Sequence, residues 1–299
     1  MGRRGILGLT LGAALAAHAL MPPSAHAEPQ PRAHQLRYDV PLDMTVIGVS
    51  AAFVIGTELF KVVKPHSCRW CDRDDETESL NGVDRWGRSS LRWRDPRKAQ
   101  FDSGVTAFLL EPAFATVDMV VAAAADNADR AFPADLLIIT EAVAVSTFLN
   151  QATKLAFARE RPFVHAMARE ERPRAAVPSD NNVSFYSGHT AMTFSLATAA
   201  GTVATLRGYR LMPLVWGTLV PLAAATGYLR VGADKHYVTD VVVGAVLGSA
   251  AGVLLPLLWH GREGGVRVPL GSGVLDPPGT AAAPLRGQQT PMVTLGGGF

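Results

Sequence analysis

Two long segments without a charged residue constrain the fold of this chain more than any other feature. They run from Leu211 to Leu229 and from Val241 to Trp259. As helices, each would be about as long as the hydrocarbon core of a lipid bilayer is thick. Other apolar segments precede them, and no useful stretch before residue 260 alternates in the way that a half-buried strand does. The sequence therefore predicts an all-α fold, a bundle of about six core helices embedded in a membrane, with an active site at one end.

The predicted helices cover residues 43–62, 104–125, 134–159, 188–206, 211–229 and 237–259. Pro112 falls inside the second of them and predicts a kink there. A charge inside a membrane span has to pair or line a polar cavity. Such charges interrupt the three earlier helices at Glu58, Glu111, Asp118 and Glu141.

The first 27 residues have the pattern of an export signal. Arg3 and Arg4 precede an apolar run over residues 6–20, and the small-residue sequence Ala25-His26-Ala27 favours cleavage before Glu28. The alternative is a retained membrane anchor. Both interpretations bring the chain to the membrane.

The chain thus divides into a signal or anchor over residues 1–27, an N-terminal helix and Cys-containing loop over 28–103, a helical core over 104–260 and a Gly/Pro-rich tail over 261–299. Residues 266–270 and 292–295 in the tail could pair as short strands. The formal net charge of +2 shows no basic surface for nucleic acid. Neither a nucleic acid nor a protein partner is expected.

Cys68 and Cys71, the chain's two cysteines, lie in a charged, Trp-containing stretch. A single C-x-x-C pair cannot complete a zinc site unless a histidine such as His66 contributes, and a redox motif would normally start a helix after a strand. In an oxidising compartment the pair predicts a local disulfide that holds a loop. A redox or metal role is the alternative.

Three clusters of polar residues fall at the ends of predicted helices. In the first, Lys154 lies seven residues before Arg161, which Pro162 follows. This spacing keeps the two cations on roughly one helical face, where they could bind a doubly charged oxyanion. The plainer interpretation is the solvated end of a helix.

The second cluster is Ser187-Gly188-His189, ahead of the apolar run over residues 191–206. Ser187 suits a helix cap, and the free N–H groups at a helix start favour an anion such as phosphate. His189 could then protonate a leaving oxygen as a general acid. The alternative is an ordinary cap followed by a partly buried histidine.

The third cluster, Arg230, His236 and Asp240, is the most specific. Because His236 and Asp240 are four residues apart at a helix start, the carboxylate can accept a hydrogen bond from one ring nitrogen and leave the other free to attack. Arg230 offers a planar guanidinium for phosphate oxygens. The alternative is a surface His-Asp pair that supports the helix.

Together the clusters resemble the signature of the type 2 phosphatidic acid phosphatase and vanadium haloperoxidase superfamily. That signature reads, in order, Lys, six residues, Arg-Pro; then Pro-Ser-Gly-His; then Ser-Arg, five residues, His, three residues, Asp. The chain has the same order and internal spacing, and the resemblance covers residues 104–259. Tyr186 stands in place of the proline and Leu229 in place of the serine, which puts loop rigidity and substrate preference in doubt.

The resemblance implies specific roles for these residues. His236 attacks phosphorus, Asp240 orients it, and His189 protonates the leaving alkoxide. No metal or cofactor is expected, because cations and a helix N-terminus already stabilise the charge. The groups expected to hold the phosphoryl group are Lys154, Arg161, Ser187, the Gly188 amide and Arg230.

The expected function is hydrolysis of phosphate monoesters or pyrophosphates, above all those of lipids, through a phosphohistidine intermediate. One alternative is a soluble periplasmic acid phosphatase of broad specificity. Others are a vanadate-dependent haloperoxidase in which His236 ligates vanadate, and a redox or scaffold protein centred on the Cys pair.

The expected location is the cell envelope, with an active site that faces the periplasm. The basic connection Arg207-Gly208-Tyr209-Arg210 would lie in the cytoplasm, which places the three clusters and the Cys pair outside. A cleaved signal followed by six spans would instead place them inside. The conflict disappears if the segment 43–62 does not span, or if the helical domain is a soluble periplasmic globule.

Overall fold

The computed structural model describes residues 33–60, 64–65, 67–71, 80–167, 171 and 178–262. Every regular element within these residues is a helix, so the all-α prediction is confirmed. The predicted signal over residues 1–27, His66, and the tail from residue 263 with its two expected strands lie outside the described residues.

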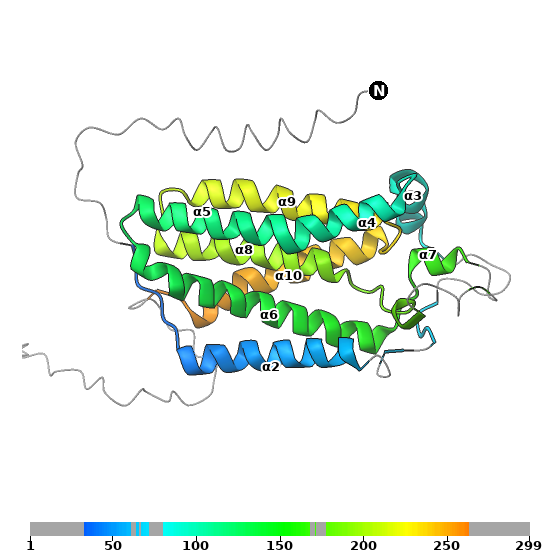
Figure 1. The fold of residues 1–299 in the computed structure, drawn as a ribbon, viewed down its shortest axis with the longest axis horizontal. Helices are drawn as coiled ribbons and strands as arrows, with labels where there is room; N and C mark the ends of the chain where they lie inside the picture. The colour runs from blue at the N-terminus through cyan, green and yellow to red at the C-terminus, as the bar shows by residue number, and fades with distance from the viewer. Residues whose placement is uncertain are drawn as a thin grey trace, which may run out of the picture. The chain divides into compact units, whose positions relative to one another are not determined.

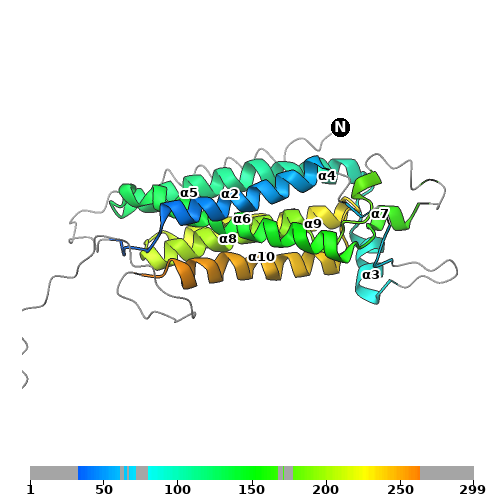
Figure 2. The ribbon, with the colours of Figure 1, turned by 90° about the horizontal axis from the view of Figure 1, so that it is seen from below.

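Among the described residues, six long helical segments run side by side, and two short helices, α3 and α7, lie at one end of them (Figures 1 and 2). One of the six is continuous through α4, a π-helical segment and α5. The bounds are α2 (Val40–Leu59), α3 (Gly82–Leu91), α4 (Pro96–Val105), α5 (Glu111–Ala125), α6 (Phe132–Phe157), α7 (Pro162–His165), α8 (Gly188–Arg207), α9 (Met212–Gly232) and α10 (Val238–Trp259).

The second predicted helix begins earlier than expected and contains a π-helical segment. It starts at Pro96, eight residues ahead of the predicted start, and Asp95 caps it, because the Asp95 side chain accepts hydrogen bonds from the amides of Arg97 and Lys98. The segment Thr106–Leu110 is π-helical and directly precedes the turn that contains Pro112. A widened turn accommodates a proline, which has no N–H to donate and whose ring crowds the preceding turn.

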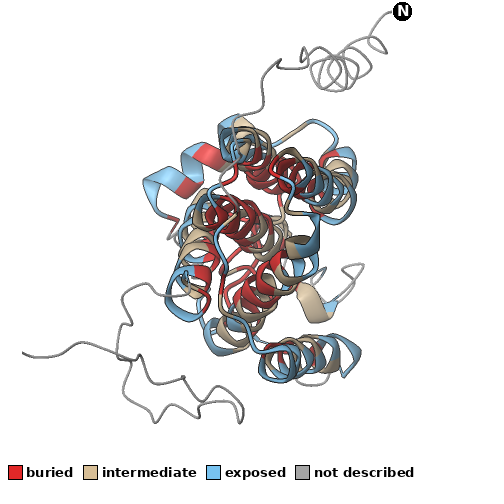
Figure 3. Cartoon of the chain, turned by 90° about the vertical axis from the view of Figure 1, so that its left-hand side faces the viewer, coloured by how far each residue is buried: buried red, intermediate tan, exposed pale blue. Residues whose placement is uncertain are grey.

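Five of the helical segments are long and apolar enough to cross a membrane, namely α2, the α4–α5 helix, α6, α9 and α10. Their outward faces carry exposed large apolar side chains such as Ile55, Phe108, Leu149 and Val246. Buried residues gather toward the middle of the bundle (Figure 3). Apolar side chains on the outside of a bundle are what a lipid environment favours.

Helix α8 lies at the centre and packs against α6, α9 and α10. Its contact with α10 depends on small residues, since Gly244, Gly248 and Gly252 of α10 face its backbone. A Cβ atom at Gly248 would lie 2.3 Å from the Ala191 carbonyl oxygen, closer than any real contact. Small residues at such positions let two helix backbones approach directly.

The charged residues inside the predicted spans have different surroundings. Glu58 bonds to Lys64 with 2.7 Å between Oε2 and Nζ, and Glu141 bonds to His260 with 2.6 Å between Oε2 and Nε2. Glu111 is fully buried, and neither of its carboxyl oxygens has a hydrogen-bond partner among the described residues. The expected pairing is therefore present at two of these positions and absent at Glu111.

Candidate active site

The three predicted clusters meet at one end of the bundle. Lys154 lies in the last turn of α6, Ser187 is the N-cap of α8, and Arg230 lies in the last turn of α9. His236 follows in the connection between α9 and α10. Since these helix ends lie at the same level of the bundle, residues 82 positions apart contribute to one site.

The hydrogen bonds of His236 define which ring nitrogen can react. Its Nδ1 lies 2.8 Å from the backbone carbonyl of Ser184, which can only accept, so Nδ1 carries the proton. Nε2 therefore holds the lone pair, and it faces Nη1 of Arg161 at 3.3 Å. His236 thus presents an unprotonated nitrogen to a cationic side chain.

Asp240 does not orient His236 by the predicted direct hydrogen bond. Its Oδ2 lies 3.7 Å from Nδ1 of His236, beyond hydrogen-bonding distance. The same oxygen instead accepts from the hydroxyl of Ser184 at 2.6 Å and from the amide of Tyr237 at 3.1 Å. Asp240 therefore acts on His236 through Ser184, because it holds the residue whose carbonyl takes the ring N–H.

Behind Asp240 lies a fully buried arginine that the sequence analysis did not single out. Arg159 donates from Nη1 to Oδ1 of Asp240 at 2.7 Å and from Nη2 to Oδ2 of Asp84 at 2.8 Å. Its guanidinium also stacks between the rings of Trp70 and Tyr237, with centroids 4.2 and 4.1 Å away. A guanidinium suits this place because it is planar and has donors for two carboxylates.

Arg161 reaches the site from a turn. Helix α6 ends before Ala158, whose φ of 49° is left-handed and redirects the chain, so the prediction that Lys154 and Arg161 share one helical face is wrong. Arg161 donates from Nε to the Asp180 carbonyl at 2.7 Å and from Nη1 to the Lys235 carbonyl at 3.0 Å. These two bonds fix the guanidinium beside His236.

The start of α8 supplies the predicted backbone amides. Ser187 occupies the N-cap position, but its side chain makes no capping bond and its hydroxyl accepts from Thr190 at 2.9 Å. A Cβ at Gly188 would lie 2.8 Å from Nζ of Lys154 and 2.7 Å from Oδ1 of Asn150. Glycine is needed here because the Lys154 ammonium approaches the helix start closely.

His189 faces the π-helical segment Thr106–Leu110, and Arg230 faces α4 just before that segment. The ring of His189 packs edge-on against Phe108, with centroids 5.0 Å apart. Arg230 donates from Nη1 to the Ser103 hydroxyl at 3.2 Å, while its Nε is buried without a partner among the described residues. A buried N–H that lacks an acceptor is a place where an anionic oxygen would be stabilised.

The electrostatics keep His236 neutral. Burial, and then the charges of Arg161, Arg230 and Lys154, hold the pKa of His236 well below its usual range. The hydrogen bond to Ser184 opposes this shift without reversing it. A neutral imidazole keeps its lone pair at acidic pH, which a nucleophile requires.

A further cation stands next to His236 in the sequence. The Lys235 ammonium lies over the ring of Phe163, 4.2 Å from its centroid. Burial, and then the charges of Arg161 and Arg230, lower the pKa of Lys235 to about 8. Several cations thus crowd one small region, an arrangement that a bound dianion would relieve.

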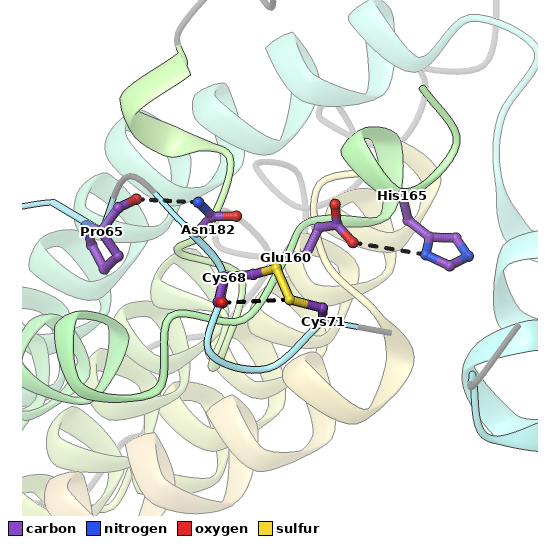
Figure 4. Close-up of a disulfide and its surroundings, with 6 residues drawn as sticks. All are labelled: Pro65, Cys68, Cys71, Glu160, His165 and Asn182. Carbon is purple, nitrogen blue, oxygen red and sulfur yellow. Dashed lines mark hydrogen bonds and ion pairs between the residues drawn. A yellow bond between two sulfur atoms is a disulfide. The ribbon is translucent and has the colours of Figure 1, made fainter. Parts of the chain in front are cut away.

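The Cys-containing loop lies against this end of the bundle. Cys68 and Cys71 form a disulfide, and Asn182 donates to the Pro65 carbonyl at 3.2 Å (Figure 4). Trp70, between the two cysteines, bonds through its carbonyl to the amide of Glu160 at 3.1 Å. The disulfide therefore closes the short loop that places Trp70 against Arg159.

Sequence reasoning missed Arg159, Asp84, Ser184 and Ser103. The sequence predicted a Cys-containing loop where α3 forms, so it assigned no contact to Asp84. The contacts of Asp84 to Arg159 and Thr239 span at least 75 residues of sequence. The one available signal was the position of Arg159 between Lys154 and Arg161 in the first motif.

The comparison with protein families agrees with this geometry. The family model of the PAP2 superfamily matches residues 135–263, which contain all three clusters and extend from α6 through α10. Neither the curated proteins nor the solved structures contain a significant match to the chain. Residues 135–263 therefore match the PAP2 superfamily, the family that the three motifs resemble.

Proposed function

We propose that the chain is a membrane phosphatase that hydrolyses phosphate monoesters or pyrophosphates of lipids through a phosphohistidine on His236. The match to the PAP2 superfamily supports a phosphatase-type hydrolase. The observation that carries the finer proposal is the tautomer of His236. Its Nδ1–H is held by the Ser184 carbonyl, and its Nε2 lone pair faces Arg161.

In the first step, Nε2 of His236 attacks phosphorus, a nitrogen–phosphorus bond forms, and the bond to the leaving oxygen breaks. The developing charge is stabilised by Lys154, Arg161, Arg230 and the amides at the start of α8. His189 gives its proton to the leaving alkoxide. The negative charge of the bound phosphoryl group offsets the surrounding cations, which favours a protonated His189 in the complex.

In the second step, a water molecule attacks the phosphohistidine. His189, now neutral, accepts a proton from that water, and the nitrogen–phosphorus bond breaks to release inorganic phosphate. His236 recovers its lone pair and His189 its proton. The cycle needs no metal, because fixed cations and helix amides supply the stabilisation that a metal would otherwise give.

A lipid substrate is favoured by where the site lies in the bundle. Five helical segments have the length and apolarity of membrane spans, and the phosphate-binding groups lie at the ends of α6, α8 and α9. The ends of spans lie at the level of lipid head groups. Exposed apolar side chains along these helices disfavour the soluble periplasmic alternative.

We place the active site on the periplasmic side. The Cys68–Cys71 disulfide lies at the same end of the bundle as His236, through the contact of Trp70 with Arg159. Disulfides persist in oxidising compartments. Labelling of a single cysteine introduced at Ser90 in intact cells tests this, and protection from a membrane-impermeant maleimide would place the site in the cytoplasm.

The proposed activity is tested by release of inorganic phosphate from a panel of lipid and soluble phosphate esters, in detergent and with EDTA present. We expect wild-type protein to act on lipid phosphates and His236→Ala to lose at least about 10³-fold in kcat. Wild type quenched in alkali should carry phosphate that is stable to base and released by acid, and the variant should lack it. Full activity of His236→Ala, or none from wild type on any ester, would overturn the proposal.

A further inference from the structure

A second cluster of ionisable side chains lies far from the phosphate-binding groups. Asp43 of α2, Glu141 of α6 and His260, which follows α10, are all buried, and one potential ligand atom of each lies within 4.8 Å of the other two. Glu141 precedes Lys154 by 13 residues on α6, which is about 20 Å along a helix axis. This cluster therefore belongs to the opposite end of the bundle from His236.

The hydrogen bonds of His260 leave one nitrogen suited to a metal. Nδ1 lies 2.9 Å from the Arg37 carbonyl, which can only accept, so Nδ1 carries a proton. Nε2 is directed at Glu141, with 2.6 Å to Oε2. A metal-binding histidine typically donates its second ring N–H to a carbonyl or carboxylate in this way.

The cluster contains two acidic side chains and one basic side chain. Within the described part of the chain, His260 is the one basic group that contacts either carboxyl group at ion-pair distance. A divalent ion bound by all three side chains would add positive charge where acidic groups outnumber basic ones.

One ligand atom is also without a partner. Glu141 is 1% exposed, and its Oε1 is buried with no hydrogen-bond partner among the described residues. Asp43 receives one hydrogen bond, at Oδ2 from the Asp39 amide at 3.0 Å. Oε1 of Glu141 therefore retains lone pairs that no hydrogen bond among the described residues uses.

From these contacts we propose that Asp43, Glu141 and His260 bind one divalent transition-metal ion, such as Zn²⁺. One imidazole and two carboxylates are ligands that Zn²⁺ and its neighbours accept. Such an ion, with bonds of about 2.0–2.2 Å, holds tetrahedral ligand atoms about 3.4 Å apart. This separation lies between the 2.6 Å from Nε2 of His260 to Oε2 of Glu141 and the 4.8 Å within which all three ligand atoms lie.

Binding exchanges the metal for one proton. The proton that Nε2 of His260 shares with Oε2 of Glu141 leaves to solvent, and both atoms then bond to the ion. The site would join the start of α2, the middle of α6 and the end of α10. The ion would stabilise the end of the bundle that lies away from the proposed active site. Its role is to hold the helices together and not to activate water or phosphate.

The test uses the full chain purified in detergent, dialysed to remove loosely held metal and then exposed to Zn²⁺ or Co²⁺. We expect about one ion per chain by elemental analysis, a visible Co²⁺ absorption band and a higher Tm with Zn²⁺. Glu141→Gln and His260→Ala should lose the ion and the Tm increase. The exposed His34→Ala, at the same end, should keep both.

If wild type bound neither Zn²⁺ nor Co²⁺ and its Tm did not rise, the proposal would be wrong. The cluster would then be an ion pair in which Glu141 and His260 share a proton. Retention of the metal by both variants would overturn the proposal equally. If His260→Ala fails to fold, Asp43→Asn provides the same comparison with less loss of packing. Because the measurements are metal content and Tm, their failure is distinct from failure of the phosphatase proposal.

Discussion

Nη1 of Arg159 donates a 2.7 Å hydrogen bond to Oδ1 of Asp240, and both side chains are fully buried. The ring of His236 lies farther from this carboxylate, at 3.7 Å, and is held by the Ser184 carbonyl. Asp240 is therefore first the partner of an arginine and only indirectly that of the proposed nucleophile. Two buried carboxylates, Asp84 and Asp240, depend on the one guanidinium.

Arg159→Met should destabilise the protein and reduce turnover together. Removing the guanidinium leaves Asp84 and Asp240 buried without their cation, and breaking a buried pair costs about 3–5 kcal/mol. Ser184, which Asp240 holds, would then position His236 less well. Thermal unfolding in detergent and phosphate release measure the two effects.

Arg92→Met is the matched control for this variant. The Arg92 side chain is 49% exposed and pairs with Asp234 at 3.2 Å. Because Asp234 keeps its pair with Arg88, the loss should be at most about 1 kcal/mol. If both variants unfolded at the same temperature and turned over alike, the proposed dependence of Asp240 on Arg159 would be wrong.

The pH profile of phosphate release should be flat in acid and fall in alkali. The pKa of His236 is held well below its usual range by burial and neighbouring cations, so mild acid should not protonate the nucleophile. The pKa of Lys235 is lowered to about 8, so its charge is present below pH 8 and lost above it. Anion binding should weaken on the alkaline side, seen as a rise in KM.

Lys235→Arg separates these two effects. An arginine stays charged across the range, so the rise in KM should move to higher pH while the acid side remains unchanged. If KM still rose at the same alkaline pH in this variant, the rise would come from a group other than Lys235.

Gly248→Leu should separate α8 from α10. A Cβ at this position would meet the Ala191 carbonyl oxygen at 2.3 Å, and backbone cannot move aside as a side chain can. Overpacking of this kind costs about 1–3 kcal/mol. We expect a lower Tm and lower kcat, because α8 carries His189 and α10 carries Asp240.

Gly217→Leu provides the comparison on α9. An added Cβ there meets nothing within 4 Å, so the protein should keep its Tm and its activity. Equal losses of Tm and activity in the two glycine variants would show that the close packing of α8 against α10 does not explain the effect of Gly248→Leu.

Cys68→Ser combined with Cys71→Ser should lower stability without abolishing phosphate release. The disulfide closes a short loop, and a loop of this size contributes modestly to stability, on the order of 2–3 kcal/mol at most. Trp70 would be held less firmly against Arg159. Loss of all activity in this variant, with His236→Ala still active, would instead favour a redox function.

The sequence was sufficient for the last long helices and the motifs because both are local signals. Uncharged apolar runs predicted α9 and α10 closely, and the family resemblance of the motifs predicted that Lys154, His189 and His236 share a site. The end of α6 was misplaced by two residues, because a left-handed alanine at position 158 has no sequence signature of the kind that glycine gives.

Contacts between distant segments could not be read from the sequence in the same way. Ser184 orients His236 through its backbone carbonyl, which every residue type possesses. Asp84 sits in a short polar helix, and its partner Arg159 lies 75 residues away. Such pairs are set by tertiary packing, so neither periodicity nor motif spacing reports them.

The groups proposed to bind phosphate all lie at one end of the bundle, at the ends of α6, α8 and α9. For a bilayer enzyme of the proposed kind, this makes the reaction sensitive to membrane sidedness. A lipid whose head group lies in the other leaflet is chemically identical but out of reach until it crosses. The measured rate in sealed vesicles would then report transbilayer lipid movement as much as the chemistry at His236.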